Sequence, residues 1–256
     1  MNAANTNENP VNNLPSGQLM SKNLMRKFDG RVVVKDVSFH VRRGEIVGLL
    51  GPNGAGKTTS FYMTVGLLAP TSGRVEINGT DITDLPIHKR ARLGIGYLPQ
   101  NASVFRKLTV EENIIAVMEV WGIPRAQRKV MLERLIEQFG VGHIRKSLGI
   151  SLSGGERRRL EIARTLVMSP HFLLLDEPFA GIDPVTVDEI QKLIARLVRE
   201  ENLGVLITDH NVRETLGVCH RAYILAGGQI LAEGDPQEVA RMDRVKEVYL
   251  GENFTL

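Results

Sequence analysis

The sequence predicts an α/β fold in which a mixed sheet carries an antiparallel β subdomain and an inserted α-helical subdomain. Short apolar runs alternate with segments of helical spacing, as in strands joined by crossover helices. A glycine-rich loop separates one strand from the next helix, and the middle of the chain has no strand pattern. At 256 residues with 43% hydrophobic content, one domain with an insertion is expected.

The first part of the chain is predicted to mix antiparallel and parallel strands. Residues 1–20 are rich in Asn and Pro and are expected to be a disordered N-terminal tail before a domain spanning 21–256. Residues 37–42 alternate apolar and polar side chains, as a half-buried strand does, and 46–50 are a short buried strand. Further strands are predicted at 73–77 and 95–98.

The middle of the chain is predicted to be the inserted helical subdomain, over about residues 101–165. Thr109 and Glu112 have the spacing of a capping box, which predicts a helix from there to about Trp121. Pro124 is a favourable first residue for a second helix. A third, amphipathic helix is expected after Glu156, with Leu160, Ala163, Leu166 and Val167 on its apolar side.

The alternation of strands and helices resumes in the last part of the chain. Residues 172–176 are predicted to be a buried strand, and Asp183-Pro184 supplies the cap and first residue of a helix. A strand at 205–208 and a hairpin around Gly227-Gly228 are expected next. Residues 250–256 are interpreted as a C-terminal tail.

Composition argues against several functional classes. The 32 basic and 29 acidic residues give a formal net charge of +3, which alone does not imply a basic, nucleic-acid-binding face. No nucleic acid is expected as a partner. The single cysteine, Cys219, can form no internal disulfide. No window has the roughly 18 apolar residues of a membrane span. Any role at a membrane is therefore expected to come through partners.

The glycine-rich loop matches a phosphate-binding pattern that ends in a lysine and a hydroxyl residue. Its backbone N–H groups would converge on phosphate oxygens at a helix N-terminus. Lys57 would reach the β- and γ-phosphates, and the Thr58 hydroxyl would bind Mg²⁺. A glycine turn that only caps a helix is the alternative. The residues expected to bind nucleotide here are Gly51, Pro52, Asn53, Gly54, Ala55, Gly56, Lys57, Thr58 and Thr59.

Two adjacent carboxylates stand at the end of the predicted strand 172–176. An α/β sheet presents its ligand site at the carboxyl ends of its strands, so Asp176 is expected to hold Mg²⁺ and its waters. Glu177 could accept a proton from the water that attacks the γ-phosphate. The alternative is an acidic strand end that is merely solvated.

A third motif, Leu152-Ser153-Gly154-Gly155-Glu156, precedes a predicted helix. Its hydroxyl and free backbone N–H groups suit an anion, although the motif could also be a simple N-cap. In order and spacing with the phosphate loop and Asp176-Glu177, it resembles the signature sequence of the ABC-transporter ATPase family. The resemblance covers nearly all of residues 21–256. It implies a P-loop NTPase core that binds ATP and Mg²⁺.

The resemblance also implies roles for residues outside these motifs. Phe28 stands where the family stacks an aromatic ring, usually Tyr, on adenine, whereas alone it would more often be a core residue. Gln100 corresponds to the glutamine that joins the two subdomains and binds Mg²⁺. His210 corresponds to the switch histidine near the γ-phosphate. With Lys57 and Glu177, Gln100 and His210 form the expected catalytic set.

The resemblance implies that two copies of this chain close head to tail as a homodimer. The resemblance therefore implies that each nucleotide lies between Lys57 of one chain and Ser153, Gly154 and Gly155 of the other. Asp183 matches the loop aspartate at the dimer contact. Hydrolysis would then require two chains.

Three segments resemble the ATP-binding subunits of lipopolysaccharide exporters: Pro178–Asp183, Asp209–Thr215 and Tyr249–Phe254. This implies a motor that drives lipopolysaccharide extraction from the inner membrane toward the outer membrane. It would lie on the cytoplasmic face, held by membrane subunits resembling LptF and LptG that dock near Phe105. A core position is the alternative for Phe105. Branched-chain amino-acid importers share the cassette and remain an alternative, as does a soluble non-transport ABC ATPase.

Overall fold

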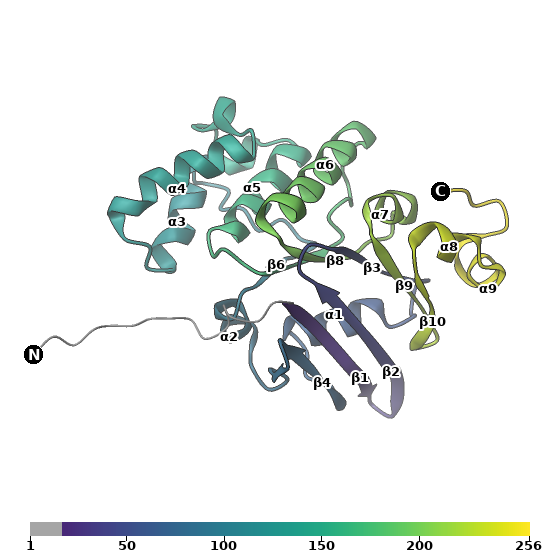
Figure 1. The fold of residues 1–256 in the computed structure, drawn as a ribbon. Coiled ribbons are helices and arrows are strands. Elements are labelled where there is room, and N and C mark those ends of the chain that lie inside the picture. Colours follow the sequence, from purple (N-terminus) through teal and green to yellow (C-terminus); the bar gives the residue numbers. More distant parts are fainter. Residues whose placement is uncertain (1–16) are drawn as a thin grey trace, which may run out of the picture.

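The computed structural model describes residues 17–256, and its central feature is a ten-stranded sheet that curls around helix α1 (Figure 1). Expectations for residues 1–16 lie outside the described residues. The strand order is β5-β4-β1-β2-β10-β9-β3-β8-β7-β6. The strands are β1 (Gln18–Phe28), β2 (Arg31–Arg42), β3 (Ile46–Leu50), β4 (Ser72–Ile77), β5 (Thr80–Asp81), β6 (Ile95–Leu98), β7 (Phe172–Asp176), β8 (Gly204–Thr208), β9 (Arg221–Ala226) and β10 (Gln229–Gly234).

Helices cover both faces of the sheet. Most of them lie where apolar residues recur at helical spacing in the sequence. In Figure 1, α3 to α6 lie together over the β6–β8 side, and α8 and α9 lie beside β9 and β10. Within residues 17–256, no helix is long and apolar enough to cross a membrane. The helices are α1 (Lys57–Val65), α2 (Ile87–Arg92), α3 (Val110–Val120), α4 (Arg125–Gln138), α5 (Gly154–Leu166), α6 (Pro184–Glu201), α7 (Val212–Val218), α8 (Pro236–Arg241) and α9 (Asp243–Val245).

The parallel half of the sheet consists of β9, β3, β8, β7 and β6. Its strands are mostly apolar because both faces are covered, and the polar residues Asp176, Thr208 and Arg221 lie at strand ends. In β7, Leu173 and Leu175 join the core under α3 to α6, while Phe172 and Leu174 join the core around α1. This packing fixes the carboxyl ends of β3, β7 and β8 along one edge, where the functional motifs begin.

The antiparallel half contains an N-terminal strand that sequence analysis missed. β1 begins at Gln18, so the expectation of a tail through residue 20 is wrong for its last residues, which pair with β2 and β4. The buried side chains are Leu19, Ser21 and Leu24. They do not follow a period of two because the register shifts near Asn23, which has φ 47°. The bulge therefore hides the strand from an alternation pattern.

The predicted helix signals at Thr109 and Asp183 are confirmed. Thr109 and Glu112 form the expected capping box at α3, and Asp183 caps α6 with Pro184 at its first turn. The hairpin at Gly227-Gly228 joins β9 to β10. Part of the C-terminal tail is packed, since Leu250 and Phe254 lie against the core under α7 and α8.

Candidate active site

The phosphate-binding loop connects β3 to α1 and is shaped by glycines. Gly51 has φ 145°, and a Cβ atom on it would lie 2.1 Å from the carbonyl oxygen of Leu225. Gly56, the N-cap of α1, has a left-handed φ of 97°. No side chain among residues 17–256 caps α1, so its first N–H groups stay available to an anion. The loop thus has the form that phosphate binding requires.

Lys57 is buried beside this loop, with its ammonium group directed at the loop carbonyls. Nζ donates to the carbonyl oxygens of Gly51 and Pro52, the second at 3.0 Å. Burial lowers the pKa of Lys57, and the negative charge of Glu177 opposes that effect. The cation is therefore held between the loop and the end of β7.

Asp176 ends β7 with a buried carboxylate. Its Oδ2 atom has no hydrogen-bond partner among residues 17–256, although the residue is only 2% exposed. Burial raises the pKa of Asp176; a hydrogen bond from Tyr62 of α1 lowers it, and the Glu177 charge raises it again. A buried carboxylate oxygen without a partner fits a cation, which would satisfy it.

Glu177 follows Asp176 with a left-handed φ of 48°, which is uncommon for a residue other than glycine. Its N–H donates to the carbonyl oxygen of Thr208 at 2.7 Å. Its carboxylate accepts a hydrogen bond from Gln100 Nε2 at 2.7 Å and lies 2.8 Å from Nε2 of His210. The structure therefore brings three of the predicted catalytic residues together from the ends of β6, β7 and β8.

Asp209 belongs to this cluster and was missed by sequence analysis. Its buried carboxylate accepts the N–H groups of Asn211 at 2.8 Å and Phe179 at 2.9 Å. Burial raises the pKa of Asp209, and these N–H groups lower it. Asp209 thus ties the segment that carries His210 to the segment after Glu177. Its position next to His210 was the only signal available in the sequence.

The signature motif forms the N-terminus of α5 and stays apart from the phosphate loop of its own chain. Ser153 is the N-cap, and it forms a capping box with Glu156. Among the described residues, its hydroxyl bonds only with Glu156. Ser153 and Gly154 are exposed, whereas Gly155 is packed against Thr186 at the start of α6. The exposed part of the motif is open to another molecule.

Two aromatic side chains with predicted roles lie at the surface. Phe28 is 39% exposed at the end of β1, and the Arg26 guanidinium carbon lies 4.6 Å from its ring centroid. Phe105 is 45% exposed, with the Arg164 guanidinium carbon 4.5 Å from its ring centroid. The core alternative is therefore wrong for both residues.

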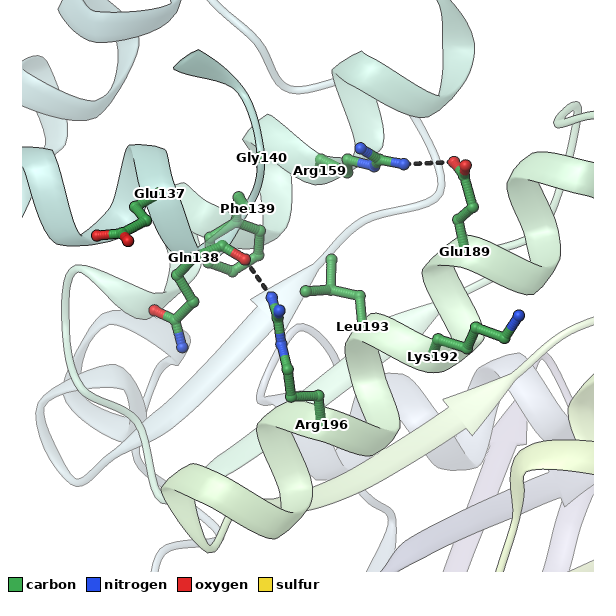
Figure 2. A pocket seen from close by; sticks show the side chains of 9 residues that line it. All are labelled: Glu137, Gln138, Phe139, Gly140, Arg159, Glu189, Lys192, Leu193 and Arg196. Carbon is green, nitrogen blue, oxygen red and sulfur yellow. Dashed lines mark hydrogen bonds and ion pairs between the residues drawn. The ribbon is translucent and has the colours of Figure 1, made fainter.

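A cleft of about 370 Å³ lies elsewhere, between the end of α4 and α6 (Figure 2). An ion pair between Arg159 and Glu189 crosses it, and Arg196 donates to the carbonyl oxygen of Gln138. None of the residues predicted to bind nucleotide lines it. The cleft marks the joint between the helical segment and α6 and is separate from the catalytic cluster.

Comparison with known proteins shows which family has this arrangement. A family model described as ABC transporter matches residues 34–180, and a chain of Haemophilus influenzae named lipopolysaccharide export system ATP-binding protein LptB is 57% identical over 93% of this chain and 99% of its own length. The chain belongs to the ABC transporter family. As an ATP-binding subunit of that family, it binds and hydrolyses ATP.

Other ABC proteins extend the comparison. LptB of Escherichia coli K12 is 56% identical over 93% of this chain and 99% of its own length. A crystal structure of an ATP-binding cassette of an ABC transporter in its ADP conformation has a TM-score of 0.82 and 27% identity, covering 92% of this chain and 99% of its own. A second family model, for branched-chain amino acid ATP-binding cassette transporters, matches residues 229–255. The predicted ABC ATPase fold is therefore confirmed.

Proposed function

We propose that this chain is the ATP-hydrolysing motor subunit of a lipopolysaccharide exporter. The observation that carries the proposal is 57% identity to the LptB of Haemophilus influenzae across almost the whole of that protein. The segments Asp209–Thr215 and Tyr249–Phe254, which resemble exporter subunits, lie at the catalytic cluster and against the C-terminal core. The substrate need not touch this chain, because its output would be the opening and closing of a dimer.

A branched-chain amino-acid importer is the second candidate. The family model with that description supports it, but the match is confined to the 27 residues 229–255. These residues form β10 and the C-terminal helices, away from the residues proposed for hydrolysis. The nearly full-length similarity to LptB therefore favours the exporter.

The phosphate loop and Lys57 are proposed to hold the nucleotide. The backbone N–H groups of this loop and of the first turn of α1 would bind the phosphate oxygens. The Lys57 ammonium would leave the carbonyl oxygens of Gly51 and Pro52 and bind the β- and γ-phosphates. Phe28 would stack on adenine, because its ring is exposed and flat.

Mg²⁺ is proposed to bind at Asp176, Thr58 and Gln100. The fit rests on the unpaired, buried Oδ2 of Asp176 and on oxygen donors of the kind this ion prefers. Within residues 17–256, no cluster of three His, Cys, Asp or Glu side chains could hold a metal alone, so phosphate oxygens would complete the ligand set. When bound, the ion would neutralise charge on the β- and γ-phosphates.

Glu177 is proposed to be the general base, with Gln100 and His210 as its partners. Both of its carboxylate oxygens are engaged, one by each partner. Each oxygen keeps a second lone pair, so the carboxylate could still accept a proton from a water. Gln100 and His210 would thus orient the base.

The exposed signature motif supports a head-to-tail homodimer. Ser153 and Gly154 would bind the γ-phosphate held by Lys57 of the other chain, through the hydroxyl and the free N–H groups of α5. Asp183, at the start of α6, would lie at the dimer contact. ATP would favour the closed pair, and loss of its γ-phosphate would release it.

Phe105 is proposed to anchor membrane subunits resembling LptF and LptG. Its half-exposed ring beside Arg164 offers an apolar and a cationic contact on the helical segment. Such docking would place the chain at the cytoplasmic face of the inner membrane.

Copurification from native membranes tests this proposal. The tagged chain is pulled down in mild detergent, with a Phe105→Ala variant as the matched control, and its partners are identified by mass spectrometry. Two membrane subunits with large periplasmic β domains, reduced in the Phe105→Ala sample, are expected. Amino-acid permeases would support the importer instead, and ribosomes or DNA would contradict a transport role.

A further inference from the structure

One buried arginine binds the main chain around Glu177 and lies outside the Leu152–Glu156 motif. Arg158 lies on the second turn of α5 and is 6% exposed. Its guanidinium reaches the carbonyl oxygens of Asp176 and Glu177 through Nη2, at 3.3 and 2.8 Å, and that of Pro178 through Nε, at 3.1 Å. Three consecutive peptide groups around Glu177 therefore share one donor group.

The remaining donors of Arg158 face the segment that follows β6. Nη1 donates to the carbonyl oxygen of Pro99 at 3.1 Å and to Oε2 of Glu161 at 3.2 Å. Glu161 is also buried, and its Oε1 accepts the N–H of Ser103 at 2.6 Å. A guanidinium has five N–H donors, and these contacts use all of them.

These contacts matter because the main chain at Glu177 is strained. Its φ of 48° disfavours a residue with a side chain, so the surroundings must hold it there. Arg158 binds the carbonyl oxygens of Asp176 and Glu177, on the two sides of this residue. Two backbone hydrogen bonds add to this support: the N–H of Glu177 donates to the carbonyl oxygen of Thr208, and its carbonyl oxygen accepts the N–H of Ala180. A buried arginine is costly unless every donor is satisfied, which this arrangement achieves.

We propose that Arg158 is a positioning residue for ATP hydrolysis, which fixes the main chain of Glu177 and, through Glu161, joins it to residues 99–103. This inference rests on the proposed role of Glu177 as the base. Ser103 is two residues from Phe105, so the same pair of side chains would link the proposed docking site to the base. A lysine could not replace Arg158, since one ammonium cannot span carbonyls on both segments.

The test is a double-mutant cycle on the full-length chain. Arg158→Met is expected to lower kcat for ATP by about 10- to 100-fold, the scale for a misplaced catalytic group, with nucleotide affinity unchanged. Arg158→Lys should recover only part of the loss. In a Glu177→Gln background, Arg158→Met should cause little further loss of kcat, because its effect acts through the Glu177 side chain.

Arg159→Met, which removes an exposed ion pair on the same helix, is the matched control and should keep wild-type kcat.

A second variant distinguishes loss of the positioning role from misfolding of the chain. Arg158→Met together with Glu161→Met replaces a buried ion pair by apolar side chains, a change that proteins often tolerate. The melting temperature and nucleotide affinity of this double variant should stay near wild type. Its kcat should stay low. Wild-type kcat in this folded variant, or equal losses with and without Glu177→Gln, would overturn the proposal. Wild-type kcat in Glu177→Gln itself would instead reject Glu177 as the base.

Discussion

At the residue scale, the chemistry of this chain depends on how two adjacent acids differ. Asp176 is buried, and within the described part of the chain its Oδ2 atom has no hydrogen-bond partner, whereas both carboxylate oxygens of Glu177 are held by Gln100 and His210. The first environment suits a cation, and the second suits a base whose orientation is fixed by its neighbours. Neighbours in sequence thus lie in different environments because β7 ends between them.

Glu177→Gln tests the second role. The amide keeps the shape of the side chain but cannot accept a proton, so hydrolysis should fall by roughly 10² to 10⁴, the range for losing a general base. ATP binding should persist, as measured by titration with a fluorescent nucleotide. Unchanged turnover would contradict the assignment.

Lys57→Ala tests the phosphate contact. Loss of a charge-assisted hydrogen bond to phosphate should weaken nucleotide binding by about 1.5 to 3 kcal/mol. Isothermal titration with ATP measures the effect. The control is Lys192→Ala on the exposed face of α6, where the lysine pairs only with Asp188, and affinity should not change. Equal affinity in both variants would reject the role of Lys57.

The sequence predicted most residues of the site because their chemistry is local. The phosphate loop and the Asp176-Glu177 pair each have a pattern within a few residues. Arg158 and Asp209 could not be predicted, because their function depends on carbonyl and N–H groups that folding brings from other strands.

At the scale of elements, the start of α5 shows how close packing fixes the signature motif. A Cβ atom on Gly155 would lie 2.2 Å from Cγ2 of Thr186, whereas the nearest atom to one on Gly154 is the carbonyl oxygen of Gly181 at 3.7 Å. The two glycines therefore differ in function. Gly155 lets α5 approach α6, and Gly154 leaves an open surface.

Gly155→Ala should destabilise the chain by about 1 to 3 kcal/mol through overpacking, measured by urea unfolding. Adding Thr186→Ser removes Cγ2 but keeps the hydroxyl that bonds to Asp183, and should restore stability. Gly154→Ala should leave stability unchanged and lower hydrolysis. The packing explanation is wrong if Thr186→Ser gives no rescue.

Elements with regular patterns were predictable, and irregular ones were not. The capping box at Thr109 and the N-cap at Asp183 can be recognised in the sequence, because each is formed by residues three positions apart. β1 could not be predicted from the sequence, because its bulge at Asn23 breaks the alternation of apolar and polar residues and one of its partners, β4, lies far along the chain.

At the scale of the whole molecule, the proposed head-to-tail dimer needs residues of two chains for each active site. The Glu177→Gln protein should sediment as a dimer with ATP and Mg²⁺ and as a monomer without nucleotide. Ser153→Arg in the same background should stay monomeric, because the bulky cation would disturb the contact with the other chain's nucleotide. A Ser153→Arg protein that dimerises with ATP would contradict the composite site.

The central claim is that ATP hydrolysis by this chain drives lipopolysaccharide out of the inner membrane. The most direct measurement depletes the chain in its native cells and follows pulse-labelled lipopolysaccharide between the separated inner and outer membranes. After depletion, new lipopolysaccharide is expected to stay in the inner membrane. The wild-type chain should restore transfer of lipopolysaccharide to the outer membrane, whereas the Glu177→Gln variant should not. Normal arrival at the outer membrane, together with reduced uptake of branched-chain amino acids, would contradict the claim and identify an importer motor.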